Sequence, residues 1–261
     1  MASPGSVNLA GNVVGALRAR AILLDAGGVL LFPEPDRLLP LLRTAGVDPD
    51  LAALERAHYR AMAIQDQESL PPVQGSWWRN YLLGYVSACG IEPDRAELLA
   101  TEMAQGTGGH SWAHVGLGVM DGLRALAALG LPMGVVSNSD GSVEGDLRRL
   151  GVCHVPDPAQ DGSRPERGIP VRVILDSAVV GVAKPDPEIF RLALDALDLP
   201  AGTAVLHVGD SLRYDVAGAL AAGLQPVHMD PYGFCPAPDG HRHIRSLAEL
   251  ARSLAANRRS P

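Results

Sequence analysis

The sequence predicts an α/β protein whose parallel β-sheet is covered by helices on both faces and carries a small all-helical insertion. Short apolar runs of strand length alternate with segments whose apolar residues recur every three or four positions, an alternation typical of parallel sheets. One long stretch, residues 36–105, has helical spacing only. Three of the apolar runs end in a small polar or acidic residue, at the edge where such sheets bind ligands.

The predicted elements follow in order along the chain. Strands are expected at 21–24, 133–136, within 173–180, 203–208 and 225–229. Helices are expected at 37–44, 51–64, 77–89, 95–105, 119–129, 143–150, 187–197, 212–222 and 244–254. Residues 154–171 contain four prolines and predict a loop. Asp186 and Pro187 are placed to begin the helix that follows. The alternation of strands and helices along the chain predicts a Rossmann-like, doubly wound core.

Three parts are therefore expected in the chain. Residues 1–19 are expected to form a flexible N-terminal tail. Residues 20–33 and 110–261 are expected to form the α/β core, and residues 34–109 an all-helical domain. Between the helices of this domain, Pro, Gly and Asp mark the turns.

Composition excludes several classes of protein. The 261 residues include 47% hydrophobic and 20% charged residues, and the net charge is −7. These values exclude a largely disordered chain and argue against a nucleic-acid partner. No apolar run approaches the roughly 20 residues of a membrane span, and no basic segment precedes the apolar part of the N-terminus. We therefore expect a cytoplasmic protein without a membrane partner. The sequence predicts no oligomeric state.

The cysteines and the late histidines have no recognisable pattern. Cys89, Cys153 and Cys235 are widely spaced and form no CxxC pair, which favours a reducing compartment over a disulfide framework. His241 and His243 follow in a predicted loop and are expected on the surface.

The strand ends and one rare residue indicate the site. Asp25, Ser137 and Asp210 each end a predicted strand, and Lys184 is the single lysine among 22 basic residues. A compact ammonium differs chemically from the guanidinium found at every other basic position. We expect these side chains to meet at one edge of the sheet.

Four segments resemble the motifs of the haloacid dehalogenase-like (HAD) hydrolase superfamily. They are Asp25-Ala26-Gly27-Gly28-Val29-Leu30, Val135-Val136-Ser137-Asn138, Gly181-Val182-Ala183-Lys184-Pro185-Asp186-Pro187-Glu188-Ile189-Phe190, and His207-Val208-Gly209-Asp210-Ser211 with Asp215. They occur in the family's order, and the resemblance covers about residues 20 to 255. It implies that the helical insertion is a cap, which closes over the site and sets specificity.

The resemblance and the residue chemistry together predict a phosphohydrolase of small phosphorylated metabolites. Asp25 is expected to attack phosphorus and form an aspartyl-phosphate. Asp25 and Asp210 can share a Mg²⁺ ion, with the Gly27 carbonyl as the third ligand that the family pattern implies. Ser137 and the amide of Asn138 can bind the phosphate, which Lys184 neutralises. Asp215 and Ser211 are expected to contact these groups without binding the substrate. Asp215 either supports the metal or Lys184, or is simply an acidic residue in the first turn of a helix, where the helix dipole favours it.

One position departs from the family pattern. Family phosphatases usually carry a second aspartate two residues after the nucleophile, where this sequence has Gly27. That aspartate protonates the leaving oxygen, a contribution of about 10²–10⁴ in rate. Candidates for a replacement acid in the helical part are Asp36, Glu55, His58 and Asp66.

Alternatives to an efficient phosphatase therefore stay open. One is a catalytically impaired binding or regulatory protein, and another is a haloacid dehalogenase. Dehalogenase relatives usually lack the metal-binding fourth motif, so Gly209-Asp210-Ser211 argues against that activity. Phosphonate cleavage requires a lysine in the helical part, and there is none.

Overall fold

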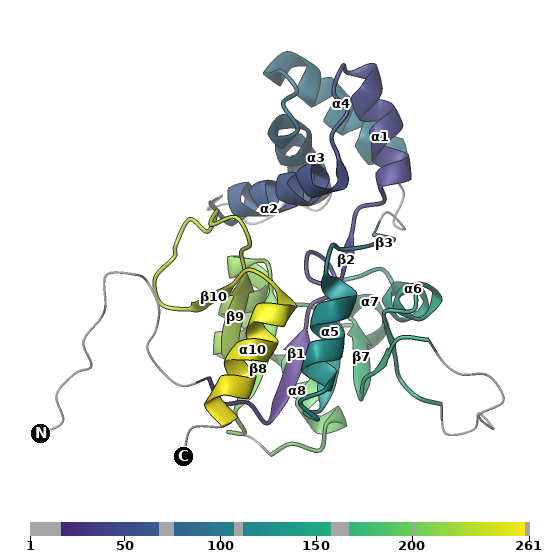
Figure 1. Ribbon diagram of the computed structural model, residues 1–261. Helices are drawn as coiled ribbons and strands as arrows, with labels where there is room; N and C mark the ends of the chain where they lie inside the picture. The colour runs from purple at the N-terminus through teal and green to yellow at the C-terminus, as the bar shows by residue number, and fades with distance from the viewer. Residues whose placement is uncertain (1–16, 68–75, 107–111, 158–166, 201, 259–261) are drawn as a thin grey trace, which may run out of the picture.

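A six-stranded sheet forms the centre of the computed structural model, which describes residues 17–67, 76–106, 112–157, 167–200 and 202–258. Its strands are β1 (Ala21–Leu24), β4 (Met133–Ser137), β7 (Val173–Asp176), β8 (Val205–Gly209), β9 (Gln225–Met229) and β10 (Arg242–Ile244). They lie in the order β10-β9-β8-β1-β4-β7, and all neighbours are parallel. The strand order reverses between β1 and β8, as in doubly wound sheets. The predicted Rossmann-like α/β fold is confirmed (Figure 1).

Helices cover both faces of this sheet. They are α5 (Val119–Ala127), α6 (Val143–Arg149), α7 (Ser177–Val180), α8 (Pro187–Ala196), the π-helical turn η1 (Leu212–Val216), α9 (Ala217–Ala221) and α10 (Leu247–Arg258). On β1, Ile22 and Leu24 pack with α5, α6 and α10, whereas Ala21 and Leu23 pack with α8 and α9. Successive side chains of a strand point to opposite faces, so this central strand is buried on both sides.

Four helices form a separate unit above the sheet in Figure 1. They are α1 (Pro35–Thr44), α2 (Leu51–Gln67), α3 (Ser76–Ala88) and α4 (Pro93–Gly106). They pack around their own hydrophobic cluster, in which Tyr81, Tyr85 and Met103 are almost fully buried. The described part of this stretch contains no strand. The short strands β2 (Leu31–Phe32) and β3 (His114–Val115) pair antiparallel beside it, so the chain segments entering and leaving the unit lie together.

Two predicted segments differ from the structure. Residues 242–244 form the edge strand β10, and the last helix begins at Leu247 instead of residue 244. The run Arg242-His243-Ile244 is short and mostly polar, so it gives no apolar strand signal. The predicted loop 154–171 overlaps a two-stranded pairing of β5 (Cys153–His154) with β6 (Ile169–Pro170).

The predicted tail lies outside the described residues up to residue 16. Leu17 is buried, and its carbonyl accepts a hydrogen bond from Asn257 Nδ2 at 3.2 Å. Packed chain thus begins before residue 20. The expected boundary at residues 109 and 110 also lies outside the described residues.

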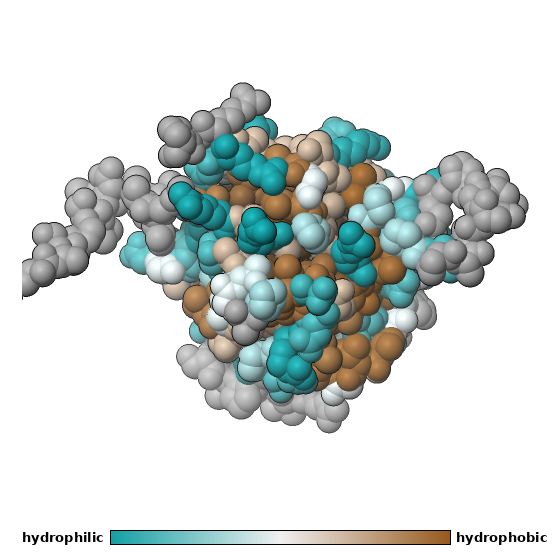
Figure 2. All heavy atoms as spheres, turned by 90° about the horizontal axis from the view of Figure 1, so that it is seen from below, coloured by the Kyte–Doolittle hydropathy of each residue, from teal (hydrophilic) through white to brown (hydrophobic). Residues whose placement is uncertain are grey.

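The end of the molecule away from α1–α4 mixes hydrophilic and hydrophobic side chains (Figure 2). None of the described helices combines the length and the apolar character needed to cross a bilayer. The carboxyl ends of the strands, where Asp25, Ser137 and Asp210 are located, lie at the other end of the sheet. That end faces the helical unit (Figure 1).

Candidate active site

Two carboxylates meet where the sheet reverses its order. Asp25 directly follows β1 and Asp210 directly follows β8, and these strands are in-register parallel neighbours with Leu24 opposite Val208. One carboxylate oxygen of each lies within 4.8 Å of the other and of an oxygen of Asp215. All three side chains are buried.

Lys184 provides the positive charge of this cluster. Its Nζ lies 2.8 Å from Oδ1 of Asp25 and 2.7 Å from Oδ1 of Asp215, and its side chain is 1% exposed. The side chain of Asn138 fixes the backbone of Lys184, because Nδ2 donates to the Lys184 carbonyl at 2.9 Å and Oδ1 accepts from its N–H at 2.8 Å. The side-chain amide of Asn138 is therefore occupied in holding the lysine.

The electrostatics of the cluster are those of an acidic site short of positive charge. Burial raises the pKa of Asp25 to about 7 against the opposing effect of Lys184, and the charges of Asp215 and Asp210 contribute to this rise. Burial, together with the charges of Asp215 and Asp66, holds the pKa of Asp210 well above its usual range. Burial alone would lower the pKa of Lys184, but its two carboxylate partners raise it above the usual value.

Asp215 is a buried support of the lysine. Its Oδ1 contacts Lys184 and also Nε2 of His207 at 2.8 Å, and its Oδ2 accepts from the Ser211 N–H at 3.1 Å. Burial opposes ionisation of Asp215, but Lys184 and His207 outweigh it and lower its pKa below the usual range. With both oxygens engaged, Asp215 holds Lys184 in place.

The donor set suits a magnesium ion. Three carboxylates facing one ammonium leave an excess of buried negative charge, which is costly unless it is neutralised. The contacts of Asp25 to Lys184 and to the Ala26 N–H both go to Oδ1, and His58 contacts only Oδ2 of Asp210. One oxygen of each ligand candidate thus remains. Octahedral Mg²⁺ needs ligand oxygens about 3–4 Å apart, and an oxygen of Asp25 lies within 4.8 Å of an oxygen of Asp210.

Side chains of helix α2 connect the helical unit to the acidic cluster and to the segments beside it. Nε2 of His58 lies 2.7 Å from Oδ2 of Asp210, and the Tyr59 hydroxyl donates to the Gly28 carbonyl at 2.7 Å. Asp66 accepts from the Ser211 hydroxyl at 2.9 Å and from the Leu212 N–H at 2.7 Å. Ser211 therefore joins the sheet to the helical unit.

The contact between His58 and Asp210 requires glycine at position 28. Its φ is +68°, and a Cβ there would lie 2.1 Å from Oδ2 of Asp210 and 2.4 Å from Nε2 of His58. Any larger residue would force the two side chains apart.

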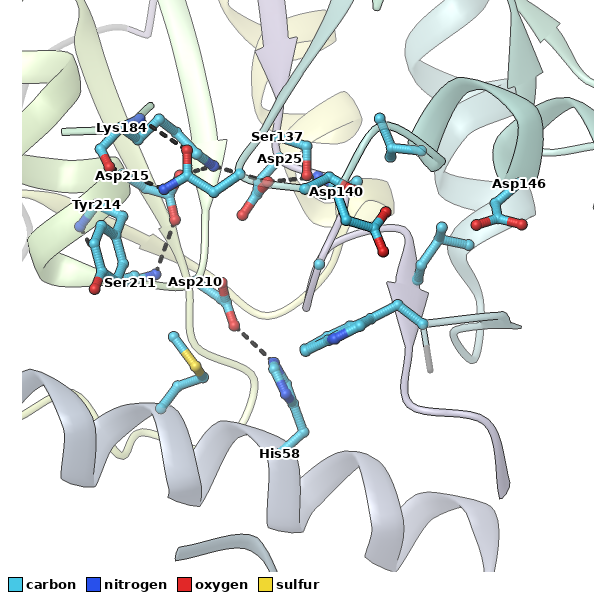
Figure 3. Close-up of a pocket in the computed structure, with 18 of the residues that line it drawn as sticks. Asp25, His58, Ser137, Asp140, Asp146, Lys184, Asp210, Ser211, Tyr214 and Asp215 are labelled. Atoms are coloured by element: carbon cyan, nitrogen blue, oxygen red, sulfur yellow. Dashed lines mark hydrogen bonds and ion pairs between the residues drawn. The ribbon is translucent and has the colours of Figure 1, made fainter. Parts of the chain in front are cut away.

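A cavity of about 390 Å³ lies between the strand ends and the helical unit. All eight site residues predicted from the sequence line it: Asp25, Gly27, Ser137, Asn138, Lys184, Asp210, Ser211 and Asp215. Figure 3 shows Asp25, Ser137 and Lys184 on one side of it and His58 rising from α2 on the other. The volume is in the range of small-molecule sites.

The sequence did not indicate several of the side chains that line the cavity. Trp112 packs its ring 3.4 Å from the place where a Cβ of Gly27 would be. Asp140 and Asp146 line the cavity from the segment after β4 (Figure 3), and Met62 lines it from α2. Asp140 lies only three residues after Ser137, so its sequence position already indicated a place near the site. The other positions depend on long-range packing.

One of the four candidate acids reaches the cavity. His58 lines it, whereas Glu55 accepts from the Leu117 N–H at 2.6 Å and Asp66 binds the segment after Asp210. Asp36 is not among the lining residues. Burial lowers the pKa of His58 to about 3, so its imidazole is neutral near pH 7.

A doubly wound sheet with carboxylates and a buried lysine at its reversal point defines an α/β protein with an acidic ligand site. The family model described as haloacid dehalogenase-like hydrolase matches residues 19–223, and the chain belongs to this family. The zebrafish haloacid dehalogenase-like hydrolase domain-containing protein 3 is 31% identical over 82% of this chain and 86% of its own length. The phosphoglycolate phosphatase of Rhodospirillum rubrum is 30% identical over 89% and 86%.

A solved structure agrees on the fold. The HAD phosphatase from Thermococcus onnurineus matches with a TM-score of 0.52 at 22% identity, over 90% of this chain and 97% of that one. At this identity the match supports the fold alone.

Proposed function

We propose that this protein is a Mg²⁺-dependent phosphohydrolase that acts on a small phosphorylated metabolite in the cytoplasm. The proposal rests on one observation: Asp25, Asp210 and Lys184 meet beneath a cavity of metabolite size. The resemblance to a phosphoglycolate phosphatase supports phosphate ester chemistry.

Asp25 is the nucleophile in this proposal. One of its two carboxylate oxygens attacks phosphorus, an O–P bond to Asp25 forms, and the bond from phosphorus to the leaving oxygen breaks. Water then attacks the aspartyl-phosphate, releasing inorganic phosphate and restoring the carboxylate. A bound Mg²⁺ held by Asp25, Asp210 and the Gly27 carbonyl would neutralise phosphate charge.

The other side chains bind and orient the phosphoryl group. Lys184, fixed by Asp215 and Asn138, places its ammonium beside the attacked phosphate. Ser137 and the backbone amide of Asn138 are hydrogen-bond donors at the end of β4. Such preorganised donors stabilise charge that develops in the transition state.

The leaving group has no obvious acid. Gly27 lacks a side chain, and Trp112 covers its Cα. His58 is neutral near pH 7 and is hydrogen-bonded to Asp210 and to the Tyr81 hydroxyl, at 2.7 and 2.8 Å. A neutral imidazole N–H is a poor acid, so we expect slow turnover or a substrate whose leaving group departs without protonation.

The helices α1–α4 act as the cap in this proposal. Their unit has its own core and covers the strand ends, and α2 contacts the acidic cluster directly. Closure of the unit would exclude bulk water from the cavity while the phosphoryl group is transferred to Asp25. Opening it requires breaking the contacts of His58, Tyr59 and Asp66.

Gly27 and Trp112 favour a second candidate, a protein that binds a phosphorylated ligand without hydrolysing it. The tryptophan ring would be the nearest neighbour of a side chain at position 27, 3.4 Å from its Cβ. Haloacid dehalogenation is a less supported third candidate, because it leaves the acidic cluster around Asp210 without a role.

A panel of phosphorylated metabolites and aryl phosphates separates these candidates. Wild type and Asp25→Asn are assayed for phosphate release with Mg²⁺ and with a chelator. The enzyme proposal expects Mg²⁺-dependent release in the wild type and none in the variant. Binding without release supports the second candidate, and full activity in chelator contradicts the metal-dependent mechanism.

A further inference from the structure

A second group of potential ligands lies at the other edge of the sheet, on β9 and β10. His228 on β9 is the in-register parallel partner of His243 on β10. His241 lies in the bend directly before β10, two residues before His243. Parallel pairing therefore brings three imidazoles together, with ring centroids 4.4–5.3 Å apart.

Cys235 completes the group from the loop between the two strands. Its Sγ lies 3.7 Å from Nε2 of His241, which in turn lies 3.3 Å from Nδ1 of His228. One ligand atom of each of the four residues lies within 4.8 Å of all the others. His228 and His241 are buried and the other two are half-buried. The expectation that His241 and His243 are surface residues is therefore wrong.

The hydrogen bonds around the group leave ligand atoms available. Nε2 of His228 donates to the Asp210 carbonyl at 3.1 Å, which directs its Nδ1 toward His241. Nε2 of His243 is buried and has no hydrogen-bond partner among the described residues. Asp230 shapes the loop, because its carboxylate accepts from the Phe234 and Cys235 N–H groups at 2.8 and 3.1 Å.

We propose that His228, Cys235, His241 and His243 form a tetrahedral site for a transition-metal ion, Zn²⁺ being the best match. Three nitrogens and one sulfur are typical zinc ligands, and Zn–N and Zn–S bonds near 2.0–2.3 Å place tetrahedral ligands about 3.3–3.6 Å apart. The distances from Nε2 of His241 to Nδ1 of His228 and to Sγ of Cys235, 3.3 and 3.7 Å, are close to these values. Mg²⁺ prefers oxygen ligands, so this site and the carboxylate cluster select different metals.

The proposed metal would stiffen the loop that receives the helical unit. Arg56 and Arg60 of α2 lie over the ring of Phe234, 5.7 and 5.5 Å from its centroid. The Tyr232 hydroxyl donates to the Ala52 carbonyl at 3.4 Å. Since His228 also contacts the Asp210 carbonyl, a metal here would fix both the backbone of a catalytic carboxylate and the surface against which α2 packs.

Cobalt substitution tests the site without an activity assay. Metal-free protein is titrated with Co²⁺ in excess Mg²⁺, so that the carboxylate cluster is occupied. One equivalent of Co²⁺ should produce a thiolate-to-cobalt charge-transfer band and the intense d–d bands of a tetrahedral ion, and one equivalent of Zn²⁺ should abolish both. Binding as thiolate releases the Cys235 proton to the buffer.

Two variants complete the test. Cys235→Ser should lose the charge-transfer band and bind Zn²⁺ at least about 100-fold more weakly. Loss of a residue that only hydrogen-bonds to a ligand typically costs about 10–100-fold in metal affinity, so the loss of a ligand itself should cost at least as much. Cys89→Ser, which alters another half-buried thiol, should behave as wild type. A wild-type protein that gives only weak octahedral bands, or a Cys235→Ser variant that keeps the charge-transfer band, would overturn the proposal. Native mass spectrometry of the wild type gives an independent count of bound zinc.

Discussion

Nε2 of His58 lies 2.7 Å from Oδ2 of Asp210, and both side chains are buried. Through this contact the helical unit touches the acidic cluster of the sheet directly, over a sequence separation of 152 residues. The Tyr81 hydroxyl lies 2.8 Å from Nδ1 of the same imidazole. With the imidazole neutral, Tyr81 donates to Nδ1, and the Nε2–H group donates to Asp210.

Replacing His58 should therefore weaken metal binding at Asp210. His58→Ala removes the hydrogen bond that orients this carboxylate, and loss of such partners typically costs about 10–100-fold in metal affinity. Titration calorimetry with Mg²⁺ measures the effect. His114→Ala is the control, because that histidine does not line the cavity. An unchanged Mg²⁺ affinity in His58→Ala would show that Asp210 does not depend on this contact.

Lys184→Arg should be almost as harmful as Lys184→Ala. The ammonium fits between Asp25 and Asp215 at 2.8 and 2.7 Å with 1% of the side chain exposed, and a planar guanidinium does not fit the same space. Removing one partner of a buried ion pair costs about 3–5 kcal/mol, so Lys184→Ala should lower the thermal midpoint, and Lys184→Arg should lower it because the larger guanidinium displaces its neighbours. Activity and thermal unfolding of the two variants check this. An arginine variant with near wild-type values would make the single lysine an accident of composition.

Gly27→Asp should raise hydrolysis of a generic aryl phosphate by restoring the missing acid. A Cβ fits at ordinary contact distance, 3.4 Å from Trp112, and the ring of Trp112 is its nearest neighbour. We therefore expect the larger gain, up to about 10²–10⁴, when Trp112→Ala is added. Trp112→Ala alone is the control. A folded double variant without gain would show that the acid is not what limits the rate.

Alkaline pH should destabilise the protein through Cys153. Burial raises the pKa of this thiol in the folded state from 9.0 to about 12. Below pH 9 both states keep the proton, so the group contributes no pH dependence. Above pH 9 only the unfolded state ionises, and stability falls by up to about 1.4 kcal/mol per pH unit until the folded pKa is reached.

Denaturant unfolding between pH 8 and 11 measures this slope. Cys153→Ala should flatten the alkaline slope while lowering stability at every pH. Val152→Ala, a neighbouring core truncation without a titrating group, should lower stability and leave the slope unchanged. Equal slopes in wild type and Cys153→Ala would contradict the burial effect.

Site residues could be predicted from the sequence where a reactive residue type stands at a position that the local pattern already marks. Asp25, Ser137 and Asp210 directly end buried strands, so their convergence follows from parallel pairing, and Lys184 stands out as a residue type. The contacts of His58 and Trp112 arise from docking of the helical unit, which no local spacing encodes. The histidines of β9 and β10 were missed for a related reason: β10 is a short, polar edge strand, and its register with β9 places His243 beside His228.

The most direct test of the account is the covalent state of Asp25 during turnover. Protein incubated with an aryl phosphate and Mg²⁺ is quenched in acid and digested, and its peptides are analysed by mass spectrometry. The account predicts a phosphoryl group on the peptide that contains Asp25, absent in Asp25→Asn and in chelator. Phosphate release with no adduct on that peptide, or release that persists in Asp25→Asn, would contradict it.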